Sequence, residues 1–207
     1  MSADHELSER AYTSLKFDLV EGRLAPGRIH IGKLADRYGM SATPVREAML
    51  RLVGEALLEM PPAGGFEIPS LDEMAVRHLY ALSQYVMLTA AACRSGLLVD
   101  LDFAAGCLSD VPPPIEQLFD SLAKGTQNAP LIFFVRNLND RMRRVRRAEE
   151  SKLSGLDREF GAISAQIEHG NKQSIRRSMI AYHRRRLRHL PEIMSALAQH
   201  GIGSSQN

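Results

Sequence analysis

Apolar residues recur at helical spacing in three short segments near the start of the chain. In residues 9–21 this pattern predicts a helix, and the glycines and proline of residues 22–27 end it in a turn. A second amphipathic helix is predicted at residues 31–38, followed by Gly39, which suits the left-handed conformation of a tight helix exit. The apolar positions are Ala11, Leu15, Leu19 and Val20 in the first segment and Ile31, Leu34, Ala35 and Tyr38 in the second.

A third helix is predicted to begin almost immediately after Gly39. Thr43 can cap its N-terminus, and Pro44 suits its first helical position. Its apolar residues fall at i, i+3, i+4 and i+7 and are Val45, Ala48, Met49 and Leu52. Two helices joined by the short Gly-Met-Ser connection predict a helix-turn-helix.

Two short apolar stretches follow the third helix and flank a turn-forming sequence. Residues 57–60 and 66–69 lie on either side of Pro-Pro-Ala-Gly-Gly at 61–65, which predicts a two-stranded wing. Residues 70–72 then mark a linker and the start of a new helix. We therefore expect residues 1–70 to form a winged helix-turn-helix domain.

The remainder of the chain, residues 71–207, is almost entirely helical in pattern. The helical pattern is interrupted near Gly96, residues 112–114, residues 128–130, Gly155 and residues 170–171, which leaves about six helices. The predicted fold class is therefore mainly α, with an N-terminal winged helix-turn-helix and a C-terminal all-α bundle.

Bulk composition changes this picture little. The chain has 207 residues, of which 44% are hydrophobic and 24% charged, as in ordinary globular domains. It contains no apolar run near the roughly 20 residues that span a bilayer, and its N-terminus is too polar for a signal peptide, so we expect a cytoplasmic protein without membrane contact. Two cysteines without a Cys-x-x-Cys motif, Cys93 and Cys107, are expected to be reduced packing residues.

Charge gives no general support to DNA binding by the first domain. The whole chain carries a formal net charge of +2, but residues 1–70 hold eight Lys and Arg against ten Asp and Glu, a net charge of −2. Binding to the phosphate backbone would then depend on a few well-placed cations and on helix N-termini, not on a broad basic face.

The motif of the first domain resembles the GntR family of bacterial regulators. The resemblance rests on GRLAPG at 22–27, Leu-Ala at 34–35 and GMSATPVREAMLRL at 39–52, and it covers residues 8–70 in order. The form Thr-Pro-Val-Arg-Glu-Ala points to the FCD subgroup, whose members carry an all-helical effector domain. The resemblance implies a homodimeric regulator that binds double-stranded operator DNA.

Candidate DNA contacts lie at the start of the third helix and in the wing. A helix that enters the major groove presents its N-terminal residues to the DNA, so Ser41 and Thr43 can hold phosphates and Arg46 can bind guanine bidentately. Family members commonly have Arg at position 42, where this chain has Ala42. The further candidates are Arg51, expected to be solvated or to face phosphate, and the wing glycines Gly64 and Gly65.

Each of these residues also has a purely structural interpretation. Ser41 and Thr43 can serve only as helix caps, and Arg46 can be a surface ion-pair partner. Gly64 and Gly65 can serve only the geometry of the turn. The alternatives stay open at this point.

The resemblance also implies a divalent metal in the helical domain, held by one Asp and three His. In this chain the corresponding positions are Ile115, Phe119, Phe160 and Tyr182, which are poor donors to such an ion. We therefore expect no metal and no cofactor, although a shift of one residue in the alignment would restore His183 as a single ligand. These four residues line either a pocket for an apolar or amphipathic effector or a packed core.

Two basic runs stand in the helical domain, at residues 141–147 and 184–188. Such runs are most often solvated faces, and we interpret both in this way, with an acidic ligand or partner as the alternative. The chain shows no nucleophile and base pair and no paired carboxylates of a catalytic site, so we do not expect an enzyme. The leading hypothesis is an effector-responsive regulator, and its rival is a DNA-binding protein whose helical domain only dimerises.

Overall fold

The computed structural model describes residues 3–94 and 112–203, and the chain divides into two compact units. One unit comprises residues 1–70 with 199–207, and the other comprises residues 71–198. Within the described residues no helix is long and apolar enough to cross a membrane. The predicted break at Gly96 and the second cysteine, Cys107, lie outside the described residues.

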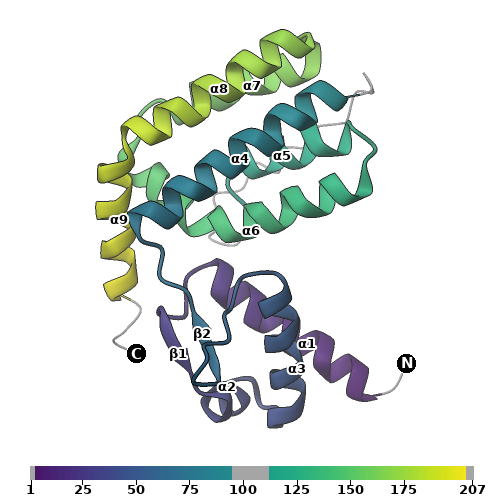
Figure 1. Ribbon diagram of the computed structural model, residues 1–207, viewed down its shortest axis with the longest axis vertical. Helices are drawn as coiled ribbons and strands as arrows, with labels where there is room; N and C mark the ends of the chain where they lie inside the picture. Colours follow the sequence, from purple (N-terminus) through teal and green to yellow (C-terminus); the bar gives the residue numbers. More distant parts are fainter. Residues whose placement is uncertain (1–2, 95–111, 204–207) are drawn as a thin grey trace. The chain divides into compact units, whose positions relative to one another are not determined.

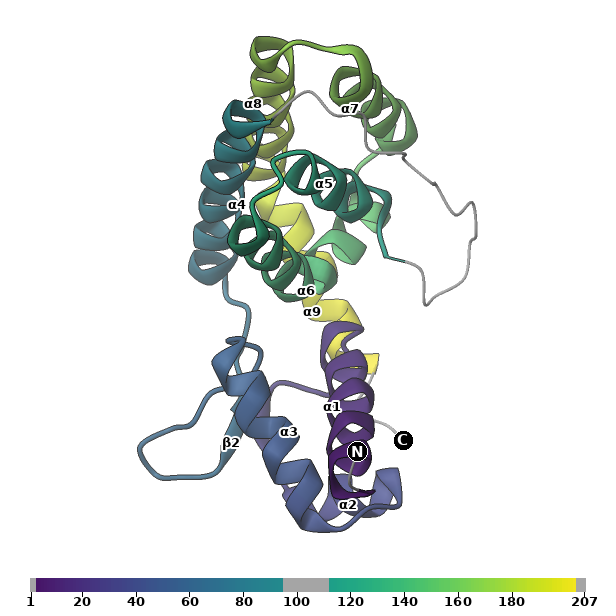
Figure 2. The ribbon, with the colours of Figure 1, turned by 90° about the vertical axis from the view of Figure 1, so that its right-hand side faces the viewer.

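The first unit contains the three predicted helices. They are α1 (Ala3–Val20), α2 (Ile31–Tyr38) and α3 (Ala42–Gly54), and α1 and α2 both pack against α3 (Figure 2). The apolar positions predicted for α1 and α3 are all buried, as are Leu34 and Ala35 of α2. Gly39 has φ 62° and ψ 40°, so it ends α2 in the left-handed conformation as expected. The predicted helix-turn-helix is confirmed.

The start of α3 differs by two residues from the prediction. Ser41 is the N-cap residue, with an extended backbone at φ −74° and ψ 165°, and Ala42 is already helical. Thr43 is therefore not the cap, and Pro44 is the third helical residue, still within the first turn. Proline is tolerated there because the first N–H groups of a helix have no partner within the helix.

The wing forms a small sheet whose pairing differs from the predicted hairpin. Strand β2 (Phe66–Ile68) pairs antiparallel with β1 (Gly27–Ile29), which was not predicted as a strand and whose first residue closes the predicted turn. The predicted partner segment, residues 57–60, contributes a single bridge between Glu59 and Glu67. The hairpin prediction was thus incomplete, because β1 is three residues long and its partner is distant in sequence.

The second unit is an all-helical bundle. Its elements are α4 (Glu73–Cys93), α5 (Pro114–Lys124), α6 (Ala129–Lys152), α7 (Leu156–His169), α8 (Lys172–Arg188) and the first part of α9 (Leu190–Gly203). Helix α4 packs along α8 and also contacts α5 and α6 (Figure 1). Asp72 caps α4 by accepting a hydrogen bond from the Ala75 amide at 2.7 Å, which agrees with the predicted helix start.

The described residues contain six helices after Ser70, and one break was missed. The predicted segment between Gly96 and residue 112 lies outside the described residues. Helix α8 ends at Arg188, and α9 begins at Leu190, directly before Pro191. Proline has no N–H to continue the α8 hydrogen-bond ladder and disfavours a helical residue before it. The expectation that Cys93 is a packing residue was wrong, because this free cysteine is exposed at the end of α4.

Candidate DNA-binding surface and the core of the helical domain

The N-terminus of α3 presents three polar side chains to solvent. Ser41, Thr43 and Arg46 are all exposed, and the Ser41 hydroxyl forms no cap hydrogen bond. Within residues 3–94 and 112–203, no hydrogen bond or ion pair engages the Arg46 guanidinium. The helix is held from the opposite side by Val45, Ala48, Met49 and Leu52, which are fully buried. This geometry leaves the first turn of α3 available to a ligand.

Arg51 is held by helix α1. Its guanidinium forms an ion pair with Glu9 and lies 3.8 Å from the ring centroid of Tyr12. One turn further along α3, Glu55 contacts the same face of α1 and accepts a 2.7 Å hydrogen bond from Tyr12 Oη. Arg51 therefore positions α3 on α1, and of the two basic candidates on this helix Arg46 is the more accessible.

The wing glycines both have left-handed backbones. Gly64 has φ 77° and Gly65 has φ 87°, conformations that L-residues with side chains rarely adopt. Turn geometry alone therefore explains both glycines. The loop that contains them projects from the unit between α3 and β2 (Figure 2), so a contact with DNA is also sterically open.

The four predicted pocket residues all lie in the core of the helical bundle. Ile115 and Phe119 lie on α5, Phe160 on α7 and Tyr182 on α8, and each is at least nine-tenths buried. The structure brings Phe119 and Tyr182 together with their ring centroids 5.3 Å apart in an edge-to-face contact. This contact favours the packed-core interpretation of these positions.

Two arginines of the basic runs are buried, which corrects the interpretation of both runs as solvated faces. Arg146 of α6 is 1% exposed, and Arg186 of α8 is not exposed at all. Arg186 follows Tyr182 and Met179 at i+4 and i+7, so it belongs to the buried stripe of its helix. The same spacing relates Arg146 to Met142 and Asn139. This spacing was visible in the sequence. Because arginine is rarely buried, the run of basic residues was nevertheless interpreted as a solvated face.

Carboxylates compensate Arg186 in the core. Its Nε donates to Glu149 Oε2 at 2.8 Å, and its Nη1 donates to Glu159 Oε1 at 2.6 Å. Tyr80 of α4 donates to the other Glu149 oxygen at 2.6 Å, and burial together with this carboxylate raises the pKa of Tyr80 well above its usual value. The Arg186 guanidinium stacks 3.6 Å from the Tyr182 ring centroid. The cluster joins α4, α6, α7 and α8.

Arg146 is compensated separately, at the interface of α5 and α6. Its Nη1 donates to Asn139 Oδ1 at 2.9 Å and lies 3.2 Å from Glu116 Oε1. Glu116 also accepts two hydrogen bonds from Arg143, at 2.7 and 3.0 Å. Sequence analysis missed both carboxylates, Glu116 and Glu149, because neither belongs to a recognisable motif.

His183 is a buried structural residue. Its Nδ1 lies 2.7 Å from the Met179 carbonyl, which can only accept, so Nδ1 carries the proton and Nε2 accepts from the Ser83 hydroxyl at 3.0 Å. Burial lowers the pKa of His183 to about 4, so it is neutral near pH 7. Both ring nitrogens are engaged, and the described residues contain no group of three His, Cys, Asp or Glu placed to hold a metal. These residues do not fit the metal that the resemblance implies.

We expect purified protein to contain no stoichiometric zinc, nickel or manganese. Because a metal bound only to the folded state stabilises it, chelator treatment should leave the melting temperature unchanged if no metal is bound. Elemental analysis of the purified chain, with melting curves before and after chelation, measures both quantities. About one tightly held metal ion per chain would contradict this prediction.

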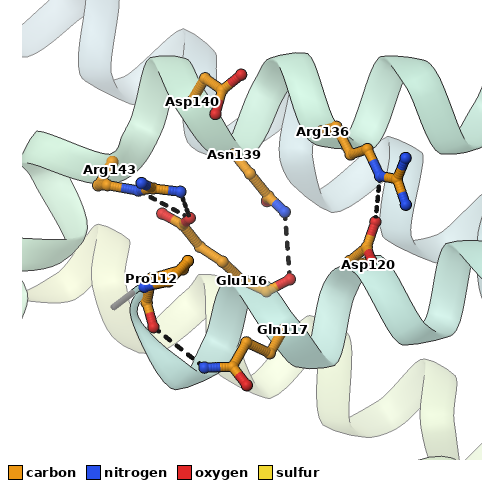
Figure 3. Close-up of a pocket in the computed structure, with 8 residues that line it drawn as sticks. All are labelled: Pro112, Glu116, Gln117, Asp120, Arg136, Asn139, Asp140 and Arg143. Atoms are coloured by element: carbon orange, nitrogen blue, oxygen red, sulfur yellow. Dashed lines mark hydrogen bonds and ion pairs between the residues drawn. The ribbon is translucent and has the colours of Figure 1, made fainter. Parts of the chain in front are cut away.

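An open pocket of about 190 Å³ lies between α5 and α6 and is lined mainly by charged and polar residues. Two ion pairs cross it, from Arg143 to Glu116 and from Arg136 to Asp120, and Asn139 lies between them (Figure 3). Glu116 and Asn139 also contact Arg146, so the pocket floor is connected to the core. The lining residues are Pro112, Glu116, Gln117, Asp120, Arg136, Asn139, Asp140 and Arg143.

The first unit, with its three helices, small sheet and exposed start of α3, defines a winged helix-turn-helix of the DNA-binding class. Residues 7–68 match the family described as bacterial regulatory proteins, gntR family. The match lies within the first unit, which therefore carries a gntR-family DNA-binding domain.

Individual relatives agree with this assignment. The chain is 32% identical over 120 residues to the HTH-type transcriptional regulator McbR of Escherichia coli, an alignment that covers 58% of this chain and 52% of McbR. The chain thus spans about half the length of this relative. The structures of E. coli McbR/YncC and of a GntR protein from Rhodococcus sp. RHA1 share its fold. The McbR/YncC structure has a TM-score of 0.70 and 22% identity, and the alignment covers 93% of this chain and 99% of that one. The Rhodococcus structure has a TM-score of 0.71 and 16% identity, and the alignment covers 91% of this chain and 98% of that one.

Proposed function

We propose that this protein is a DNA-binding transcriptional regulator that recognises a pseudo-palindromic operator as a homodimer in the cytoplasm. The observation that carries the proposal is the exposed start of α3 within a gntR-family domain. Ser41 and Thr43 offer hydroxyl groups and free backbone N–H groups to phosphates, and Arg46, one turn further along, reaches base edges. A dimer follows from the half-site symmetry of such operators.

The helical domain has two candidate roles, response to a small-molecule effector and dimerisation alone. Phe119 and Tyr182 contact each other in the core with Arg146 and Arg186 stacked beside them, which argues against an apolar effector among the four predicted pocket residues. The pocket between α5 and α6 favours an effector role of a different kind. Its paired arginines and carboxylates suit a small polar ligand with groups of both charges.

Selection of bound duplexes from a randomised DNA pool tests the proposed function directly. The full chain should enrich a sequence with two related half-sites. A metabolite screen for release of that operator then separates the two roles of the helical domain, because a purely dimerising domain gives no ligand-dependent change in affinity. Failure to enrich any sequence would contradict the proposed function.

A further inference from the structure

The tip of the wing carries no charged side chain of its own. Residues 61–65 read Pro-Pro-Ala-Gly-Gly, and the following strand supplies only Glu67 as a charged residue. A protein loop that approaches the phosphate-lined grooves of DNA gains affinity through cations. If the wing contacts DNA, the charge therefore has to come from another segment.

Arg28 of strand β1 places a guanidinium at this position. Its Nη2 lies 3.5 Å from the Gly64 carbonyl, at the outer limit of a hydrogen bond. At Gly65 a Cβ atom would meet Arg28 Nη2 at 3.4 Å and Nε at 3.6 Å, so the guanidinium packs directly on the backbone of the wing turn. Arg28 is nevertheless exposed. Strand pairing over almost 40 residues brings this cation to the wing.

Arg28, like Arg46 of α3, has no carboxylate partner among the described residues. Glu67 is its cross-strand neighbour, yet no ion pair joins them. By contrast, Arg23 and Arg37 both pair with Asp18, and Arg51 pairs with Glu9. A guanidinium held at a weak contact and without a compensating carboxylate is available to a negatively charged ligand.

We propose that Arg28 is the cation through which the wing contacts DNA, and that it enters the minor groove beside the major-groove site of α3. The inference rests on the proposed DNA-binding function and assigns a second specificity residue to it. Narrow A·T-rich minor grooves concentrate negative potential and attract arginine side chains. Gly64 and Gly65 present no side chains, so the backbone beside Arg28 can approach the groove closely.

The test uses the full chain and an operator obtained by selection from a randomised duplex pool. Arg28→Ala should weaken binding by about 10-fold to 100-fold per dimer, since two groove contacts are lost. The slope of log affinity against log salt should become shallower by about 0.9 per lost contact. Because Arg28 is exposed, the melting temperature should not change, and Arg28→Lys should retain the salt slope while losing part of the affinity.

Arg23→Ala is the matched control. It removes the same charge from the same unit, and Asp18 keeps Arg37 and the Tyr38 hydroxyl as partners. It should bind the operator within about twofold of the unchanged protein, as expected for a surface ion pair. An equal loss of affinity in both variants would show a general charge effect and overturn the assignment of Arg28.

Base substitutions in the operator flank identify the groove. Inosine–cytosine pairs keep the minor groove of A·T pairs, whereas G·C pairs add an amino group there. The unchanged protein should tolerate inosine–cytosine but not G·C, and Arg28→Ala should lose this discrimination. Discrimination that persists in the variant, or unchanged affinity, would overturn the inference. If the protein selects an operator and only these results fail, the proposed function stands and the role of Arg28 falls.

Discussion

Arg46→Ala is expected to abolish specific operator binding while the fold stays intact. The substitution removes a bidentate base contact worth roughly 1–3 kcal/mol at each half-site, so a dimer loses twice that amount. The side chain is exposed and has no partner among the described residues, so its removal leaves no buried group uncompensated. Binding to operator and to random duplexes, measured side by side, gives the discrimination ratio.

Arg51→Ala serves as the comparison on the same helix. Its guanidinium is engaged by Glu9 and Tyr12, so we expect a smaller change in sequence discrimination than for Arg46. Operator discrimination that is unchanged in Arg46→Ala would show that α3 reads bases through other residues. Circular dichroism of both variants checks that the helices are retained.

Glu149→Gln should destabilise the helical domain by about 3 kcal/mol, because it removes one of the two carboxylates that pair with the buried Arg186 guanidinium and leaves Glu159 as the remaining partner. The side chains of Glu149 and Arg186 are at most 2% exposed, so water cannot replace the lost carboxylate. Tyr80 also loses its charged acceptor. For a chain of this length, the melting temperature should fall by roughly 10 °C.

Glu150→Gln is the control, one residue away on the same helix. Its partner Arg147 lies 3.4 Å away and both side chains are about one-third exposed, so the pair contributes little. The melting temperature should shift by no more than about 2 °C. Equal melting temperatures for the two variants would mean that the buried cluster contributes no more to stability than a surface ion pair.

Local sequence was sufficient for the helix-turn-helix and its candidate contacts. The i, i+3, i+4 and i+7 spacing of Val45, Ala48, Met49 and Leu52 determines which face of α3 is buried, and thereby that Arg46 is exposed. Gly39 marks the turn because glycine adopts the left-handed conformation at a helix end without the strain that a Cβ atom adds. These features depend on residues within a few positions of one another, so they can be predicted from the sequence alone.

Only the tertiary structure decided what distant segments do to one another. Strand β1 exists because Phe66–Ile68 pairs with it, and Arg28 reaches the wing for the same reason. Arg186 is compensated by Glu149 and Glu159, which lie on other helices. Hydrophobic periodicity records how much of a helix is buried, but it does not record which charged groups meet in the core. That pairing depends on contacts across tens of residues, and only the packed bundle shows it.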